Sequence, residues 1–340
     1  MTLAEKIRRI SVTAFRNVSR RWLLAAGASL ATVASIAAGV WLWSHNANAA
    51  AEPTRRIPAS AALNSVICSP DGGFLVAGCV TGDVVVCELP SGRTQLLPKL
   101  ATDPITTLSL SSTSFLIAGT VDREVVGWQL GTGEVENTLS FPEFPAPVAA
   151  SAVHPNRFDA LVGLSDGSIY HFVRDQEPRR LSSRHAGGVK SICYRPDAAS
   201  FVTGGTDGRL IWRIAETLRI ESAVRAHSNE VGGLAFSADG QLLASGDYDG
   251  LVIVRDGKTT EEVFRFREPD AVSALAFTEA FLITGSWDGR LSFWSLATQE
   301  LSREIQTEGP VLGLAVDANS DTLATVHGTD AILLWSIVDE

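Results

Sequence analysis

The chain has 340 residues, of which 45% are hydrophobic, and carries 28 basic against 38 acidic residues for a formal net charge of −10. This apolar fraction is enough to form a core and excludes a largely disordered chain. Residues 1–48 hold six of the basic residues and one of the acidic ones, so the remainder has 22 against 37 and a net charge of −15. A surface of that sign repels phosphate backbones and argues against nucleic acid as a partner.

The N-terminal residues are typical of a membrane anchor. Residues 1–21 are basic, and residues 22–43 contain no charged side chain over about the length of a helix that crosses a bilayer. The positive-inside rule predicts a cytoplasmic segment 1–21, a single transmembrane helix (a signal anchor) over 22–43, and a periplasmic or extracytoplasmic location for the rest. Residues 44–56 are small and polar, which predicts a linker.

Two export signals are alternatives to an anchor. Ala47-Asn48-Ala49 resembles a signal-peptidase site, and Arg20-Arg21 stands in a sequence that resembles a twin-arginine signal. Because a cleaved signal normally has a shorter apolar core than this segment, an uncleaved anchor is favoured. Each alternative predicts that the rest of the chain leaves the cytoplasm.

A unit of about 41 residues recurs seven times over residues 57–340. Each copy has an apolar strand, a polar turn, a second strand that usually ends in Gly, a tight turn and a third strand. Such a unit cannot bury its apolar face alone, which predicts one all-β domain of stacked copies. Asp-Gly in the tight turns predicts hairpins in which both central residues have positive φ. The turn Asp recurs in five copies: Asp122, Asp166, Asp207, Asp249 and Asp288.

The last copy predicts how the two ends of the domain meet. It stops after its third strand, at Trp335 to Ile337, and therefore lacks an outer strand. The segment near Arg56 to Ala61 could supply that strand and join the two ends of the chain.

No residue pattern indicates catalysis, a cofactor or a metal. The six histidines are scattered, without Cys or carboxylate neighbours at zinc-ligand spacing. No nucleophile elbow, phosphate loop or haem-attachment motif is present. Gly204-Gly205 is interpreted as a close packing point, because no helix is predicted to follow it. The cysteines all fall in predicted strands and are expected to be buried free thiols, although Cys68 could pair with Cys79 or Cys87 in an exported domain.

Over residues 57–338 the repeats resemble the WD40-repeat family. The resemblance lies in polar turns such as Phe236-Ser237-Ala238-Asp239-Gly240, in Leu243-Ala244-Ser245-Gly246, and in histidines ahead of the first strands. Trp128, Trp212, Trp294 and Trp335 stand at or beside the family's third-strand Trp. The resemblance implies a seven-bladed WD40-type β-propeller.

In this family a His, a Ser or Thr, the turn Asp and the Trp form a side-chain network within a blade. The resemblance assigns these roles in the fourth copy to His185, Thr203, Asp207 and Trp212, with the Trp one residue early. In the fifth copy it assigns His227, Ser245 and Asp249, with Arg255 in place of the Trp.

The resemblance also implies where a partner binds, because family members often dock partners on the face of the loops between blades. Tyr248 and Trp287 precede the turn Asp in adjacent copies, and exposed aromatics are typical interface anchors. The other candidate residues at this rim are Thr206, Lys190, Glu230 and Asp270. We expect a non-enzymatic scaffold that binds a protein or peptide. The alternative is an exported enzyme or cofactor-binding propeller with a site in its central funnel.

Overall fold

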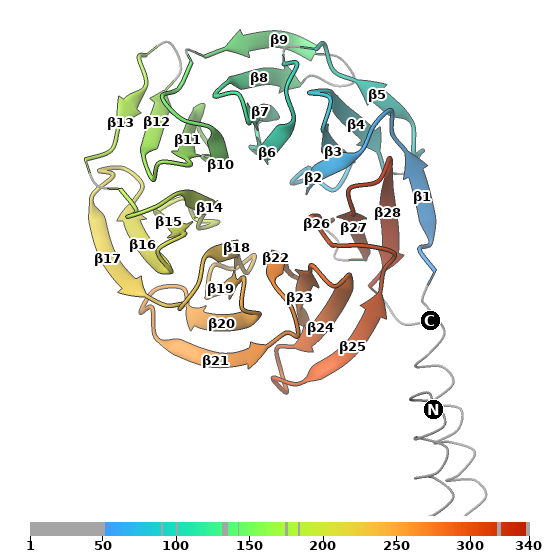
Figure 1. Cartoon of the computed structure of the whole chain (residues 1–340), viewed down its shortest axis with the longest axis vertical. Coiled ribbons are helices and arrows are strands. Elements are labelled where there is room, and N and C mark those ends of the chain that lie inside the picture. Colours follow the sequence, from blue (N-terminus) through green and yellow to red (C-terminus); the bar gives the residue numbers. More distant parts are fainter. Residues whose placement is uncertain are drawn as a thin grey trace, which may run out of the picture. The chain divides into compact units, whose positions relative to one another are not determined.

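The computed structural model describes residues 52–337, except residues 90, 100, 131–134, 142, 174–175, 183 and 318–320. These residues form seven antiparallel sheets of four strands each, arranged around a centre as a closed ring (Figure 1). The protein is thus a seven-bladed β-propeller, as the repeats predict. No helix occurs in this part of the chain.

Each blade runs from an innermost strand at the centre of the ring to an outer strand at its edge. In blades 1 to 7 the innermost strands are β2 (Leu63–Cys68), β6 (Ile105–Leu110), β10 (Val148–Val153), β14 (Val189–Tyr194), β18 (Val231–Phe236), β22 (Val272–Phe277) and β26 (Gly313–Val316). The second strands are β3 (Phe74–Cys79), β7 (Phe115–Thr120), β11 (Asp159–Leu164), β15 (Ser200–Gly205), β19 (Leu242–Asp247), β23 (Phe281–Ser286) and β27 (Thr322–Val326). The third strands are β4 (Val84–Glu88), β8 (Val125–Leu130), β12 (Ile169–Val173), β16 (Arg209–Ile214), β20 (Leu251–Asp256), β24 (Arg290–Ser295) and β28 (Ala331–Ser336). The outer strands are β5 (Thr94–Leu96), β9 (Val135–Ser140), β13 (Arg179–Arg180), β17 (Ile220–Arg225), β21 (Glu262–Arg267), β25 (Leu301–Gln306) and, in blade 7, β1 (Arg55–Pro58).

Burial follows the position of a strand within its blade. The second strands are covered on both faces by neighbouring blades, so every residue of β7, β11 and β15 is buried. The outer strands β17 and β21 instead alternate exposed and half-buried residues, because one of their faces meets solvent. The core therefore lies between the blades, in a series of apolar layers around the ring.

A glycine near the end of each second strand in blades 1 to 6 lets the next blade approach closely. A Cβ built on Gly246 would come within 2.6 Å of Val272 Cγ1 on β22 of the next blade. Gly204 stands in the same relation to Val231 at 2.7 Å. These contacts are far shorter than a methyl group allows, so the glycines set the spacing between adjacent sheets.

The tight turns differ from the prediction in their backbone geometry. The glycine after the Asp has positive φ, at 71° in Gly208 and 81° in Gly250, but the Asp itself does not. Only one left-handed residue is therefore required, where two were predicted. In blade 2 that place is taken by Arg123, with φ 68°.

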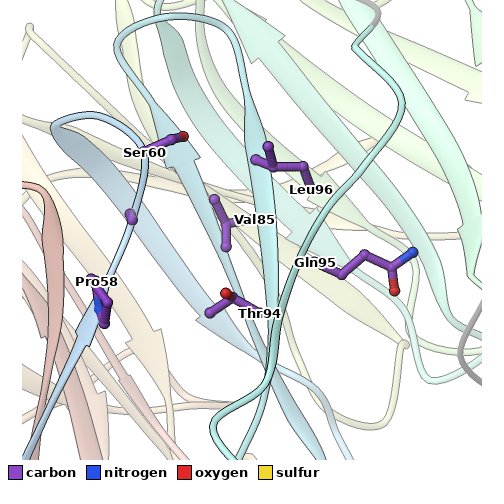
Figure 2. A pocket seen from close by; sticks show the side chains of 7 residues that line it. Pro58, Ser60, Val85, Thr94, Gln95 and Leu96 are labelled. Carbon is purple, nitrogen blue, oxygen red and sulfur yellow. The ribbon is translucent and has the colours of Figure 1, made fainter.

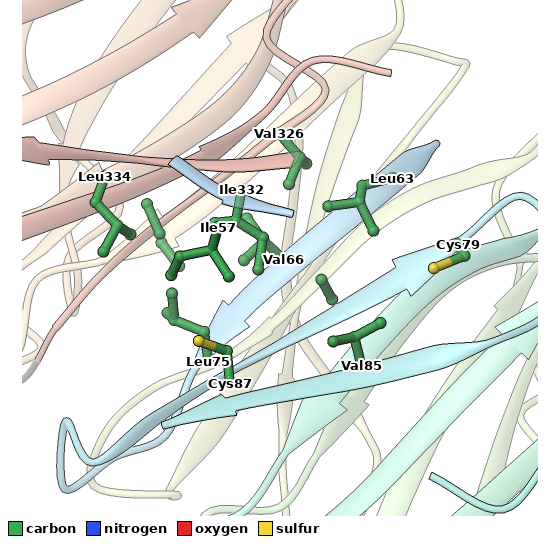
Figure 3. Close-up of a cluster of buried hydrophobic side chains, with 13 residues drawn as sticks. Ile57, Leu63, Val66, Leu75, Cys79, Val85, Cys87, Val326, Ile332 and Leu334 are labelled. Atoms are coloured by element: carbon green, nitrogen blue, oxygen red, sulfur yellow. The ribbon is translucent and has the colours of Figure 1, made fainter. Parts of the chain in front are cut away.

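The two ends of the described chain meet in blade 7. β1 pairs antiparallel with β28, with Arg56 opposite Leu333 and Ile57 opposite Ile332. Ile57 is buried between the last blade and the first, in a cluster that includes Leu63, Leu75 and Leu334 (Figure 3). The predicted closure by an N-terminal strand is confirmed, and the strand begins at Arg55, inside the predicted linker.

Several sequence predictions fall outside the described residues. These are the cytoplasmic segment 1–21, the transmembrane helix 22–43 and most of the linker 44–56. Within the described residues no helix is long and apolar enough to span a membrane.

All four cysteines are free, so the alternative of a disulfide to Cys68 is not present in the structure. Cys79 and Cys87 are buried, while Cys68 and Cys193 are partly accessible. Burial raises the pKa of the Cys79 thiol to about 11 and that of Cys193 to about 11. Thiols with such pKa values stay protonated at neutral pH and are poor nucleophiles.

Candidate functional site

One face of the propeller carries the tight turns between second and third strands, together with the loops that lead from each outer strand to the next blade. We call it the loop face. The turn residue ahead of the Asp donates its backbone N–H to the preceding loop: Thr206 to Gly188 O at 2.9 Å, Tyr248 to Glu230 O at 3.2 Å. Trp287 makes the same bond to Ala271 O at 3.0 Å. The blades thus fix the height and orientation of these side chains.

Four of the six predicted binding residues meet on the loop face of blades 4 to 6. The rings of Tyr248 and Trp287 lie 5.8 Å apart between centroids. Lys190 Nζ lies 5.3 Å from the centroid of the Tyr248 ring and 2.8 Å from Glu230 Oε2. We call Lys190, Glu230, Tyr248 and Trp287 the aromatic patch. Trp287 is 50% exposed, which is unusual for so large an apolar side chain.

The Lys190 ammonium holds the patch together electrostatically. Partial burial acts to lower the pKa of Lys190, but the carboxylate of Glu230 and the hydroxyl of Tyr248 outweigh it and raise that pKa. Lys190 is therefore a fixed cation between two partners. This arrangement orders Tyr248 without a ligand.

The other two predicted residues lie on the same face but do not bond to this patch. Thr206 packs against Gly187, where an added Cβ would lie only 2.0 Å from the Thr206 hydroxyl oxygen. The exposed Asp270 accepts a 2.7 Å hydrogen bond from the N–H of Ala271. Among the described residues, no hydrogen bond or ion pair joins Thr206 or Asp270 to the aromatic patch.

In blade 4 the structure places His185 between Thr203 and Asp207. Nδ1 lies 2.9 Å from Asp207 Oδ1, and Nε2 lies 2.9 Å from Thr203 Oγ1. Because an ionised carboxylate only accepts, Nδ1–H donates to Asp207 and Nε2 accepts the hydroxyl of Thr203. Trp212 does not take part, which corrects the expected network. It pairs with Val202, one residue out of step with Thr203, so its side chain points to the opposite face of the sheet.

In blade 5 the network uses a different carboxylate from the one expected. His227 Nδ1 lies 3.0 Å from Asp247 Oδ2, and Nε2 lies 2.8 Å from Ser245 Oγ. Asp249 instead accepts from the side-chain amide of Asn229 at 2.8 Å. Asp247 replaces the glycine that blade 4 has at this place, and its side chain reaches His227 first.

Blades 6 and 7 contain two networks that the sequence reasoning did not identify. In blade 6 the buried Glu268 takes the place of the His and accepts from Thr284 at 2.7 Å, Ser292 at 3.1 Å and Trp294 Nε1 at 2.8 Å. The sequence position of Glu268 could have identified this network, since Glu268 stands four residues before Val272, as His185 does before Val189.

In blade 7 the histidine comes from the second strand's turn and not from the preceding loop. His327 Nε2 lies 2.7 Å from Thr325 Oγ1, which also accepts from Trp335 Nε1 at 2.8 Å. His327 Nδ1 lies 3.1 Å from Gly309 O. No signal at the usual histidine position points to this arrangement, because Thr307 stands there.

These buried histidines predict that acid destabilises the propeller. Burial lowers the pKa of His185, in spite of Asp207, and likewise lowers the pKa of His154, His227 and His327. The unfolded chain, with histidine pKa values near 6.5, then takes up protons first as the pH falls. This contribution to the free energy of unfolding is therefore fully present above that pH and is lost below it, by at most about 0.7 kcal/mol per histidine between pH 7 and pH 6.

The measurement is the free energy of unfolding in urea at pH 7 and pH 6. The free energy of unfolding should differ less between the two pH values in His185→Gln than in the parent protein, by the contribution of one histidine. Equal stability of the parent protein at both pH values would contradict the prediction.

A surface pocket of about 310 Å³ lies where blade 1 meets the closing strand (Figure 2). Its lining includes Pro58, Val85, Thr94, Gln95 and Leu96 and contains no ionisable side chain. Its Ser60 and Thr94 hydroxyls therefore have no acid or base beside them in the lining. Within the described part of the chain, no group of three or more His, Cys, Asp or Glu residues could hold a metal ion.

The fold and the His–Ser/Thr–Asp networks define a class: seven-bladed propellers built from repeats with a buried polar network. Comparison with known proteins finds a family model similar to part of the propeller. A family model described as "WD domain, G-beta repeat" matches residues 177–212, 219–256 and 260–295. Each match starts at or near an outer strand and ends within the third strand of the next blade, so the sequence repeat is offset from the blade. These three segments are therefore similar to the WD repeat.

Among curated proteins, the chain is similar to "Cell division cycle 20.1, cofactor of APC complex" of Arabidopsis thaliana, with 28% identity over 72% of this chain and 57% of that protein. It is 26% identical to "Telomerase protein component 1" of Rattus norvegicus, over 59% of this chain and 8% of that protein. It is 25% identical to "WD repeat-containing protein slp1" of Schizosaccharomyces pombe, over 65% of this chain and 47% of that protein. The chain spans about half the length of the cell-division relatives it matches.

These comparisons overturn the predicted location. Two of the relatives are named for cell division and for telomerase, and none of these three is described as an exported or membrane-anchored protein. The prediction of a membrane-tethered propeller on the extracytoplasmic side, and of export by a cleaved signal, is therefore wrong. It rested on the charge and hydropathy of residues 1–43 alone, which lie outside the described residues.

Proposed function

We propose that the protein is a non-enzymatic interaction platform that binds a protein or peptide on the loop face of blades 4 to 6. The carrying observation is the aromatic patch, in which a half-exposed Trp287 stands beside an ordered Tyr248. A large exposed aromatic on a rigid frame buries apolar area at little cost in side-chain order.

The relatives support this proposal by their names, since one is described as a cofactor of a complex and another as a WD repeat-containing protein. Neither name describes an enzyme. Binding by this chain would use a preformed surface, because backbone bonds from Tyr248 and Trp287 to the neighbouring loops already fix the rim.

The proposal predicts that Trp287→Ala and Tyr248→Ala weaken partner binding without unfolding the domain. A random peptide library displayed on phage would be selected against the full chain, and the affinity of enriched peptides measured by titration. Loss of an interface anchor costs about 2 kcal/mol, so we expect about thirtyfold weaker binding for Trp287→Ala.

Val121→Ala is the matched control. Val121 precedes the turn Asp of blade 2, as Trp287 does in blade 6, and is 43% exposed. This variant should leave the affinity unchanged. If enriched peptides bind the Trp287→Ala and Tyr248→Ala variants as tightly as the parent, the aromatic patch is not the binding site.

A further inference from the structure

Two arginines face each other at the loop-face end of blade 4. Arg209 begins β16 and Arg225 ends β17, and the two residues are direct partners across the antiparallel pair. Side chains so placed lie on one face of the sheet with Cβ atoms about 5 Å apart, and like charges there are destabilising. Both side chains are exposed. Among the described residues, no ion pair or side-chain hydrogen bond engages either guanidinium.

Blade 6 shows how the same position is neutralised elsewhere in the ring. Arg290 occupies the place of Arg209, but its cross-strand partner is the neutral Gln306. Its guanidinium lies 2.9 Å from Asp288 Oδ2 and 3.2 Å from Glu304 Oε2. Two carboxylates therefore balance one cation.

Neither of those carboxylates neutralises the pair in blade 4. The residue equivalent to Glu304 is Ala223. The residue equivalent to Asp288 is Asp207, whose Oδ1 accepts from His185 and from the Arg209 backbone N–H, and whose Oδ2 accepts from Ala186 N–H. The carboxylate is thus committed to the buried network and does not reach the arginine side chain.

The pair is also joined to the aromatic patch along the chain. After Arg225 the backbone turns at Ala226 and His227, both of which donate to Gly208 O at 3.0 Å, and then runs to Glu230. Glu230 is already paired with Lys190, so it does not neutralise Arg225. A partner segment that follows this turn outward from the patch would reach the two arginines.

We propose that Arg209 and Arg225 form an anion-docking site that takes the carboxylates of Asp or Glu side chains in a segment of the protein partner. This inference rests on the proposed function and adds the charge of the partner. Two planar guanidinium groups match carboxylate oxygens in bidentate geometry, and an incoming carboxylate relieves the repulsion between them.

The first test measures the thermal stability of the full chain. Arg225→Gln removes the repulsion and should raise the Tm at low ionic strength, and the gain should disappear in concentrated NaCl, which screens exposed charges. Arg219→Gln is the control, because Arg219 is exposed in the same blade, beside the opposite end of β17. A fall or no change in Tm for Arg225→Gln would contradict the electrostatic part of the proposal.

The second test uses a fluorescein-labelled peptide of six glutamates and measures its binding by anisotropy. The parent protein should bind it in spite of its overall negative charge, and the Arg209→Gln/Arg225→Gln double variant should bind about tenfold more weakly or worse. Arg219→Gln and Trp287→Ala should bind it as the parent does. Because this probe does not need Trp287, its result is independent of the phage selection.

Two outcomes would overturn the proposal. One is equal binding of the glutamate peptide by the parent and the double variant. The other is stabilisation of the parent by inorganic phosphate without any binding of the peptide, which would indicate a site for small anions and not for a protein segment.

Discussion

Replacing Glu268 with alanine should lower the free energy of unfolding by about 4 kcal/mol, because a buried acceptor of several hydrogen bonds is lost. Glu268 is 4% exposed and accepts hydrogen bonds from Thr284, Ser292 and the Trp294 indole. In the alanine variant three buried donors lose their acceptor, and a cavity forms beside the Phe266–Trp294 stack, whose ring centroids are 3.7 Å apart. Urea unfolding of the full chain gives the measurement.

Glu268→His is the informative companion variant. Blades 4 and 5 have His at this place, with Thr203 or Ser245 at the position of Thr284. We therefore expect the His variant to retain a bond to Thr284 and to be clearly more stable than Glu268→Ala. Equal stabilities of the alanine variant and the parent would show that the network contributes nothing to blade 6.

Replacing Gly246 with valine should cost about 3 kcal/mol or more, because it adds branched carbons where the neighbouring blade leaves no room. The first of these carbons alone would come within 2.6 Å of Val272 Cγ1 and 2.9 Å of Val272 Cβ. Neither backbone can retreat freely, since β19 and β22 are each held in four-stranded sheets. Thermal and urea unfolding would report the loss.

The collision itself can be isolated with a double-mutant cycle. Val272→Ala alone leaves a cavity between blades 5 and 6 and is destabilising. Combined with Gly246→Val it should restore part of the lost stability, because the valine methyls then occupy the vacated space. If the two changes are merely additive, the contact between Gly246 and Val272 does not set the spacing of these blades.

The repeat and its closure could be predicted from the sequence because each copy repeats the same local pattern. The alternation of apolar residues, the turn Asp and the glycines recur in phase, and the missing outer strand of the last copy pointed to the segment near Arg56. The pairing of Arg55–Pro58 with β28 follows that expectation closely. The proximity of Tyr248 and Trp287 could be predicted because they occupy equivalent positions in adjacent copies of the repeat.

The polar networks were harder to predict for two reasons. A shift of one residue moves a side chain to the other face of the sheet, and several side chains compete for the same partner. Trp212 stands one residue from the family position, and in a strand that shift moves a side chain to the other face. Asp249 occupies the expected place, but Asp247 lies nearer to His227. Glu268 was missed because a carboxylate there does not resemble the family's histidine.

The ring is closed by pairing between the first and the last of the described strands, β1 and β28. Thr54 Oγ1 donates to Leu334 O, and the two residues are 280 positions apart in the sequence. Until β28 emerges, β1 has an unpaired edge and Ile57 lacks the neighbours that bury it, so the N-terminal strand must wait while six blades fold. A product terminated before Ala331 would lack β28, so β27 and β1 would each have an unpaired edge. Quality-control proteases that recognise exposed apolar strands could distinguish it from the full chain.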